Sequence, residues 1–239
     1  MELLFWTPLI YSLEGFPRDT SGTPYIPGSV LQQGINEALT YYYIKKDPRI
    51  ENSVKRLLLD KHLKPDSVVQ KIQELVLERY SPNFELPKVI KLNSGRIYET
   101  IVDIYDLKKW RDIDSLKIEV FEGIVSIDLD ETEFLKIAPA AHSFANALLR
   151  MEMELLEDHP LVERYYQPLM NEVRRWEIPL RIGYWTQNPY QGNLLFFWRI
   201  KEVRERFLRD FRMDIRPTKI LFLPREGVTP GWAELRKEV

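Results

Sequence analysis

The chain has 239 residues, of which 44% are hydrophobic and 12% aromatic, which is enough for a large folded core and excludes an intrinsically disordered protein. It contains no cysteine, which excludes disulfides and thiolate metal sites and leads us to expect a cytoplasmic protein. With 34 basic and 36 acidic residues the formal net charge is −2, so the overall charge does not indicate a nucleic-acid-binding protein.

The N-terminal segment predicts a strand and no targeting signal. Leu3 to Tyr11 is mostly apolar, which is typical of a central strand covered on both faces, and Pro8 indicates a bulge or an edge within it. The segment lacks the basic region of a signal peptide. The longest later apolar run, Leu194 to Trp198, is far shorter than the roughly 20 residues of a membrane span, so we expect no membrane partner.

A loop and then a helix are expected next. Glycine and proline punctuate Glu14 to Pro27, which predicts the loop. Apolar residues recur every three or four positions from Val30 to Tyr42, and Gly28 and Ser29 would cap the N-terminus of this helix. Free amides at the N-terminus of a helix can receive a phosphate, so Gly28 and Ser29 are candidate RNA contacts.

The middle of the chain predicts helices, then strands, then a helix. Pro48 to Pro87 has a helical spacing of apolar residues interrupted at Pro65, and we interpret it as a helical insertion. Val89 to Tyr105 and Leu116 to Leu129 alternate and are rich in β-branched residues, which favours strands. Phe134 to Glu157 returns to helical spacing.

The C-terminal third predicts a short strand, a loop, a helix and a hairpin. The strand is Ile178 to Tyr184, the loop runs from Trp185 to Asn193, and the helix from Leu194 to Met213 carries many basic residues. Lys219 to Leu223 and Trp232 to Leu235 would form a terminal hairpin. This order of elements predicts one α+β domain with helices against a mostly antiparallel sheet.

Most enzyme and cofactor motifs are missing from the sequence. It has no metal-ligand spacing, phosphate loop or dinucleotide fingerprint, so we expect no metal and no small-molecule cofactor. His62, His142 and His159 lack the context of a general base, and packing or surface roles are expected. The carboxylates from Asp128 to Glu133 lack the glycine and terminal glutamate of a calcium loop, which favours a solvated turn.

Aromatic residues gather near residue 185. Tyr184, Trp185 and Tyr190 alternate with amides and follow Arg181. RNA bases stack on such rings, and the arginine could neutralise a phosphate. The alternative is that the aromatic rings close the core, and the sequence leaves both interpretations open.

Three segments carry a resemblance to a known family. Pro24 to Leu31 resembles the start of the first helix in RAMP proteins of type III CRISPR systems, and Thr7 to Ile10 is similar to their first strand. Arg216 to Lys219, Gly227, and Pro230 to Trp232 are similar to the C-terminal part of the Csm-type subunit that caps the effector complex.

The resemblance implies a ferredoxin-like, RRM-like antiparallel core without nuclease activity. It implies guide RNA and other CRISPR effector subunits as partners, in antiviral defence. The chain departs from the family at Gln32 and Asn36, where a lysine and an arginine are usual. It also lacks the His-Ile-Gly that usually follows the first strand, and the glycine-rich loop is reduced to Gly183 and Gly192.

We therefore hypothesise a non-catalytic subunit that binds guide RNA and protein, as a single RAMP-like domain over 1–239 with the insertion at 48–87. One alternative is a RAMP endoribonuclease using His142 with Tyr184, and another is a purely structural assembly protein. The candidate RNA contacts are Gly28, Ser29, Lys45, Lys46, Arg181, Tyr184, Trp185 and Tyr190.

Overall fold

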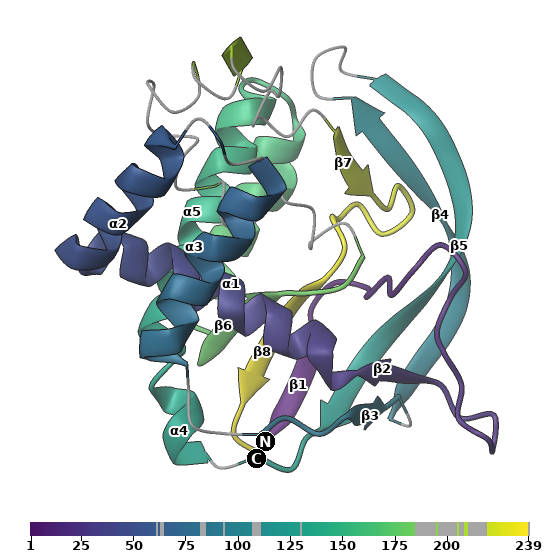
Figure 1. Cartoon of the computed structure of the whole chain (residues 1–239). Coiled ribbons are helices and arrows are strands. Elements are labelled where there is room, and N and C mark those ends of the chain that lie inside the picture. Colours follow the sequence, from purple (N-terminus) through teal and green to yellow (C-terminus); the bar gives the residue numbers. More distant parts are fainter. Residues whose placement is uncertain are drawn as a thin grey trace.

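Figure 1 shows the fold of the chain as a computed structural model. The structure describes residues 1–60, 62, 65–81, 85–92, 94–106, 111–129, 131–184, 195, 205, 208–209 and 219–238. The predicted loop from Trp185 to Asn193 lies outside the described residues, as does most of the predicted helix from Leu194 to Met213.

A six-stranded sheet forms the centre of the molecule, with strand order β6-β8-β1-β5-β4-β7 and every pair antiparallel. The central position predicted for the first strand is confirmed, because β1 lies between β5 and β8. The bounds are β1 Glu2–Phe5, β4 Gly95–Asp106, β5 Arg111–Ser126, β6 Ile178–Arg181, β7 Lys219–Phe222 and β8 Trp232–Arg236.

Strand β1 is shorter than predicted and is buried on one face only. The amides of Trp6 and Thr7 both donate to the carbonyl of Trp232, at 3.0 and 3.2 Å, which breaks the regular ladder just before Pro8. Leu3 and Phe5 are buried whereas the residues between and before them are half-buried. The prediction of burial on both faces was wrong. An antiparallel sheet can be fully packed on one face and partly exposed on the other, and Glu2 and Leu4 lie on the less buried face.

The core has the ferredoxin-like arrangement, which confirms the predicted α+β class. Helix α1 (Gly28–Lys46) follows β1, the β4–β5 hairpin comes next, and α5 (Ala138–Leu156) precedes β6 and β8. The spatial order β8-β1-β5-β4 is that of an RRM-like sheet, to which β6 and β7 add one strand at each edge. Helices α1 and α5 pack against each other, and their apolar residues share one cluster with those of β1, β6 and β8.

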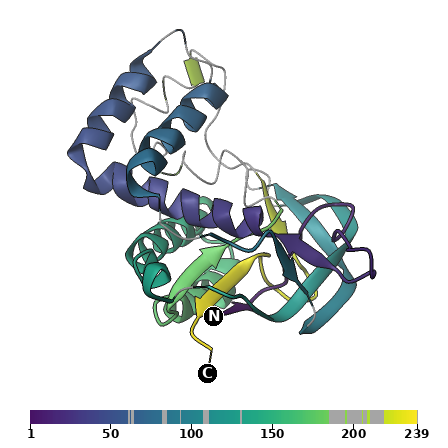
Figure 2. The same cartoon turned by 60° about the horizontal axis from the view of Figure 1, so that its bottom comes forward.

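Two helices form a separate lobe. Helix α2 (Pro48–Leu59) and helix α3 (Pro65–Tyr80) project from the end of α1 away from the sheet (Figure 2). Their break lies before Pro65, as predicted, but α3 ends at Tyr80 and does not reach Pro87. The lobe has a core of its own, made of Ile44, Ile50, Val54, Leu58, Val68, Ile72 and Val76.

The segment predicted as one helix from Phe134 to Glu157 is two. Helix α4 (Glu131–Leu135) ends before Ile137, and α5 has Pro139 in its first turn. Proline suits the first turn of a helix but interrupts a continuous one, which explains the break. A π-helical turn (Val162–Tyr166) and α6 (Gln167–Val173) then lead to β6.

The predicted C-terminal hairpin was wrong. Strand β7 pairs with β4, whereas β8 pairs with β1 and β6, so the two strands lie in different halves of the sheet. After β7 a tight turn closes with a bridge between Leu223 and Val228, and Gly227 in this turn has a φ of +70°. The chain then returns to the sheet centre, because Trp232 and Leu235 are fully buried there.

A small second sheet replaces part of the predicted loop before α1. Strand β2 (Tyr25–Pro27) pairs antiparallel with β3 (Val89–Lys91). It brings the residues that lead into α1 beside the chain that leaves the α2–α3 lobe (Figure 1). None of the helices in the described part of the chain is both long and apolar enough to cross a membrane.

Candidate nucleic-acid interface

The predicted RNA contacts do not converge on one groove. Gly28 and Ser29 lie in the first turn of α1, and Lys45 and Lys46 end the same helix of 19 residues. At 1.5 Å per residue the two ends lie about 28 Å apart. Arg181 ends β6, so the described candidates occupy three places in the fold.

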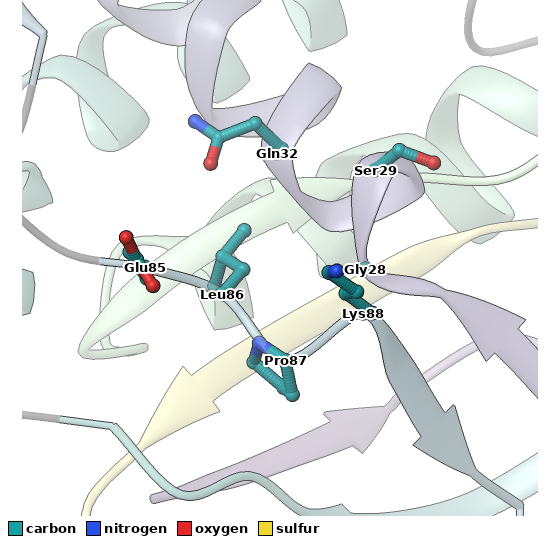
Figure 3. A pocket seen from close by; sticks show the side chains of 7 residues that line it. All are labelled: Gly28, Ser29, Gln32, Glu85, Leu86, Pro87 and Lys88. Atoms are coloured by element: carbon teal, nitrogen blue, oxygen red, sulfur yellow. The ribbon is translucent and has the colours of Figure 1, made fainter.

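The N-terminal end of α1 borders a pocket of about 630 Å³ (Figure 3). Gln32 of α1 lies on one side of it, and Glu85 and Leu86 lie on the other. The amide of Gly28 donates to the carbonyl of Lys88 at 3.0 Å, so this amide is already occupied. A methyl group on Gly28 would lie 1.9 Å from the carbonyl oxygen of Pro87, so the chain itself approaches this glycine closely.

The predicted cap of α1 was wrong. The N-cap residue is Pro27, which has no polar side chain, and no side-chain hydrogen bond caps the helix. Ser29 lies inside the first turn and is exposed. Its amide and hydroxyl remain candidates for a phosphate contact, beside the mixed charges of Glu85 and Lys88.

The C-terminal end of α1 combines exposed lysines with tyrosine rings. Lys46 donates through Nζ to the hydroxyl of Tyr42 at 2.5 Å and lies 4.8 Å from the centre of its ring. The hydrogen bond with Tyr42 raises the pKa of Lys46, so Lys46 is protonated and positively charged at neutral pH. Lys45 lies 5.3 Å from the ring centre of Tyr41, and both lysines are exposed. We call Tyr42, Tyr43, Lys45, Lys46 and Tyr80 the lysine–tyrosine surface.

Helix α3 fixes this surface in place. The ring of Tyr80 stacks on that of Tyr43 with centroids 3.6 Å apart and planes 4° apart. The hydroxyl of Tyr80 donates to Asp47 Oδ2 at 2.5 Å, while Asp47 Oδ1 accepts from the amide of Arg49 at 2.9 Å and caps α2. These hydrogen bonds lower the pKa of Asp47, with that from Tyr80 contributing most. Half-buried Tyr42 and Tyr43 are thereby held beside the two lysines.

Sequence reasoning found the lysines but missed the tyrosines. The run Tyr41-Tyr42-Tyr43 directly before Lys45 was the available signal. Tyr80 had none, because it lies 37 residues from Tyr43 in sequence and joins the surface only through the packing of α3 on α1.

Arg181 is not at the surface. Its guanidinium forms an ion pair with Glu152 of α5, and the two side chains are 4% and 2% exposed. The guanidinium also lies 5.4 Å from the ring centre of Trp232. A cation held in this way cannot reach an RNA phosphate, so the predicted role of Arg181 does not fit its place, and it joins β6 to α5 instead.

Tyr184 is half-buried and its backbone amide donates to the carbonyl of Ile10 at 2.6 Å. Its ring packs against a buried cluster that includes Ile10 and Val102. This position favours the core-closing interpretation for Tyr184. Trp185 and Tyr190 lie outside the described residues.

The predicted pair of His142 and Tyr184 is not seen among the described contacts, in which the carbonyl of His142 accepts from Asn146 and the amide of Tyr184 donates to Ile10. A different pair does: the Tyr105 hydroxyl lies 3.0 Å from His159 Nε2. His159 Nδ1 accepts from the amide of Leu161 at 3.3 Å, which places the proton of the neutral ring on Nε2. Within the described ranges, no group of three or more metal-ligating side chains could hold an ion.

No known protein-family profile matches the chain. An uncharacterized protein of Aquifex aeolicus (strain VF5) is 38% identical over 242 residues, spanning 100% of both chains. A chain in the cryo-EM structure of a Csm–crRNA–target RNA ternary complex of a type III-A CRISPR-Cas system is 16% identical, with a TM-score of 0.55 over 91% of this chain and 74% of that one.

The crystal structure of T. onnurineus Csm5 is 13% identical, with a TM-score of 0.50 over 91% of this chain and 72% of that one. At such identities the likeness is one of fold. It confirms at the level of the fold the resemblance that Pro24 to Leu31 carries in the sequence.

Proposed function

The chain belongs to one family with the Aquifex aeolicus protein and shares the fold of Csm subunits, and on this premise we propose that it is a non-catalytic, RNA- and protein-binding subunit of a type III CRISPR effector complex. In this role it acts in the cytoplasm, in antiviral defence. The whole chain acts as one RAMP-like domain, and the helical insertion of 48–87 contributes only Tyr80 to its RNA-facing surface.

The observation that carries this proposal is the extent of the shared fold. The match to both Csm structures covers 91% of the chain, so it includes more than the ferredoxin-like core that many unrelated proteins share. One of those structures is a complex with crRNA and target RNA. A subunit with this fold is therefore expected to meet both RNA and neighbouring subunits.

The lysine–tyrosine surface is the part of the described chain best suited to RNA. Lys45 and Lys46 are exposed cations that can pair with consecutive phosphates, and each is positioned against a tyrosine ring. Tyr80 and Lys46 cover one face each of the Tyr43 and Tyr42 rings, and the exposed remainder of these two half-buried rings is what unstacked bases would contact. The same lysines also favourably oppose the negative end of the α1 dipole, which is the role they would have without RNA.

Incubation of the purified chain with single-stranded RNA derived from a CRISPR repeat tests the proposal. We expect salt-sensitive binding that leaves the RNA full length. A purely structural assembly protein would bind neither this RNA nor a matched duplex above the non-specific level, and that result would overturn the RNA-binding part.

RNA cleavage would instead favour an endoribonuclease. Tyr105 and His159 are then the pair to test, because they form the one described His–Tyr hydrogen bond. Loss of cleavage in His159→Ala, with cleavage retained in His142→Ala, would assign the activity to this pair and refute the non-catalytic role.

A further inference from the structure

Trp6 is a fixed aromatic side chain that lies open to solvent just after β1. It is 46% exposed, which is unusual for a residue that also packs against other groups. Its ring stacks on that of buried Trp176, with centroids 5.2 Å apart and planes 17° apart. Its indole Nε1 donates to Glu234 Oε2 at 3.3 Å. Trp6 is thus held in one orientation with part of its surface uncovered.

This tryptophan lies on the sheet face of Leu4 and Glu234. Leu4 pairs in register with Glu234, and the two therefore share a face, while Leu3 and Phe5 on the other face are buried in the core beside α1. The indole of Trp6 donates a hydrogen bond to the side chain of Glu234, so Trp6 lies on the same face as Glu234 and Leu4.

Two acidic residues, Glu234 and Glu177, lie at the edge of the stacked Trp6 and Trp176 rings. Glu234 is only 7% exposed, and its Oε1 accepts from the amide of Glu177 at 2.9 Å. Neither of these two carboxylates forms an ion pair with a described residue. Three cations in this region are paired with other carboxylates, Arg236 with Glu2 at 3.2 Å, Lys237 with Glu131 at 3.2 Å and Arg175 with Glu172 at 3.4 Å.

We propose that Trp6 and Glu234 form a docking site for an arginine side chain of a protein partner. A guanidinium can stack on the exposed face of an indole and donate hydrogen bonds to a carboxylate at its edge, which a lysine ammonium does less well. A buried carboxylate without a cation gains most from such a partner. The negative charge disfavours RNA on this face, although bare aromatic rings on an RRM-like sheet would otherwise suit it.

This inference does not rest on RNA binding, since Trp6 lies beside β8 whereas the lysine–tyrosine surface lies at the end of α1 beside the α2–α3 lobe. Tryptophan and arginine are the residues most enriched among the energetic centres of protein interfaces. The site would therefore anchor a neighbouring subunit while RNA occupies a different surface.

The test uses the full chain labelled with nitrogen-15 and a short peptide, acetyl-Gly-Arg-Arg-Gly-amide, with its lysine counterpart as the matched probe. The Trp6 indole signal, assigned from Trp6→Phe, is followed during titration. We expect the arginine peptide to shift this signal and to bind at least roughly threefold more tightly than the lysine peptide. Trp6→Ala and Glu234→Gln should each weaken arginine binding by roughly three- to tenfold.

Two control variants separate the site from general effects. Leu13→Ala removes another exposed apolar side chain, and Glu99→Gln removes another carboxylate, which is paired with Lys117 on the β4–β5 hairpin. Both should bind the arginine peptide like the parent. Equal binding of the two peptides, an unmoved Trp6 signal, or a shift of that signal by single-stranded RNA alone would each overturn the proposal. Trp6→Phe, which keeps a ring in place, covers the case in which Trp6→Ala fails to fold.

Discussion

Glu37 is a carboxyl group buried in the middle of α1, and its replacement by glutamine should make the protein more stable at high pH. The residue is 8% exposed, and its one described hydrogen bond comes from Gln33 Nε2 at 3.4 Å. Burial raises the pKa of Glu37 from 4.5 to about 8. The folded protein therefore keeps this group protonated at neutral pH.

The direction of the effect follows from proton linkage. Between pH 4.5 and about 8 the folded state binds a proton at Glu37 that the unfolded state has lost. Stability therefore falls as the pH rises through this window. At 1.36 kcal/mol per pKa unit, a difference of 3.5 units lowers the free energy of unfolding by at most about 5 kcal/mol between pH 4 and pH 9. Glutamine cannot ionise, so Glu37→Gln should lose this dependence.

Urea unfolding of the parent and of Glu37→Gln at pH 5, 6, 7, 8 and 9 measures the difference. The matched control is Glu74→Gln, since Glu74 accepts a hydrogen bond from Gln70 in the same i,i+4 arrangement but is exposed on α3. As the pH increases, we expect the free energy of unfolding of Glu37→Gln to exceed that of the parent by a growing amount. The difference between Glu74→Gln and the parent should stay constant. Parallel curves for both variants would refute the reasoning.

Three further predictions concern the fold. Gly28→Ala should cost about 1–3 kcal/mol of unfolding free energy in urea titrations, because its methyl group meets backbone at 1.9 Å, whereas Ser29→Ala one residue later should cost little. Glu152→Leu should cost about 3–5 kcal/mol by leaving Arg181 buried without its partner, and adding Arg181→Met should recover most of that loss; no recovery would mean that the ion pair is not the cause. The pKa of Asp47 is lowered in the folded state. Asp47 therefore contributes fully to the stability of the fold above 3.8, its pKa in the unfolded chain, and this contribution is lost as the pH falls through its folded-state pKa. The loss of stability in Asp47→Ala should therefore shrink in unfolding measurements made in acid, and a loss that does not depend on pH would contradict this.

Local signals in the sequence located most elements correctly. Pro27 and Gly28 mark the start of α1 within one residue of the prediction, and Pro65 marks the start of α3. Proline and glycine act through the backbone dihedral angles of their own position, so their effect can be read without the rest of the fold.

Pairings between distant segments could not be predicted in this way. β7 and β8 are close in sequence, yet β7 pairs with β4 whereas β8 pairs with β1 and β6, and both β4 and β1 lie more than 100 residues earlier in the chain. Arg181 was predicted to be a surface cation, but in the fold it lies beside Glu152, which is 29 residues away in the sequence. The lysine–tyrosine surface is intermediate, since Lys45 and Lys46 were predicted but Tyr80 came from the fold.

The central claim is that RNA binds where α1 ends beside the α2–α3 lobe. Its most direct test is the salt dependence of binding to single-stranded, repeat-derived RNA. The double variant Lys45→Ala/Lys46→Ala is compared with Lys55→Ala/Lys71→Ala, which removes the same charge from exposed positions on α2 and α3. We predict that the slope of log affinity against log salt falls by about 1.4 in the first variant, about 0.7 for each lost phosphate contact, and stays at the parental value in the second. Equal slopes for the two variants would contradict the placement of RNA on this surface.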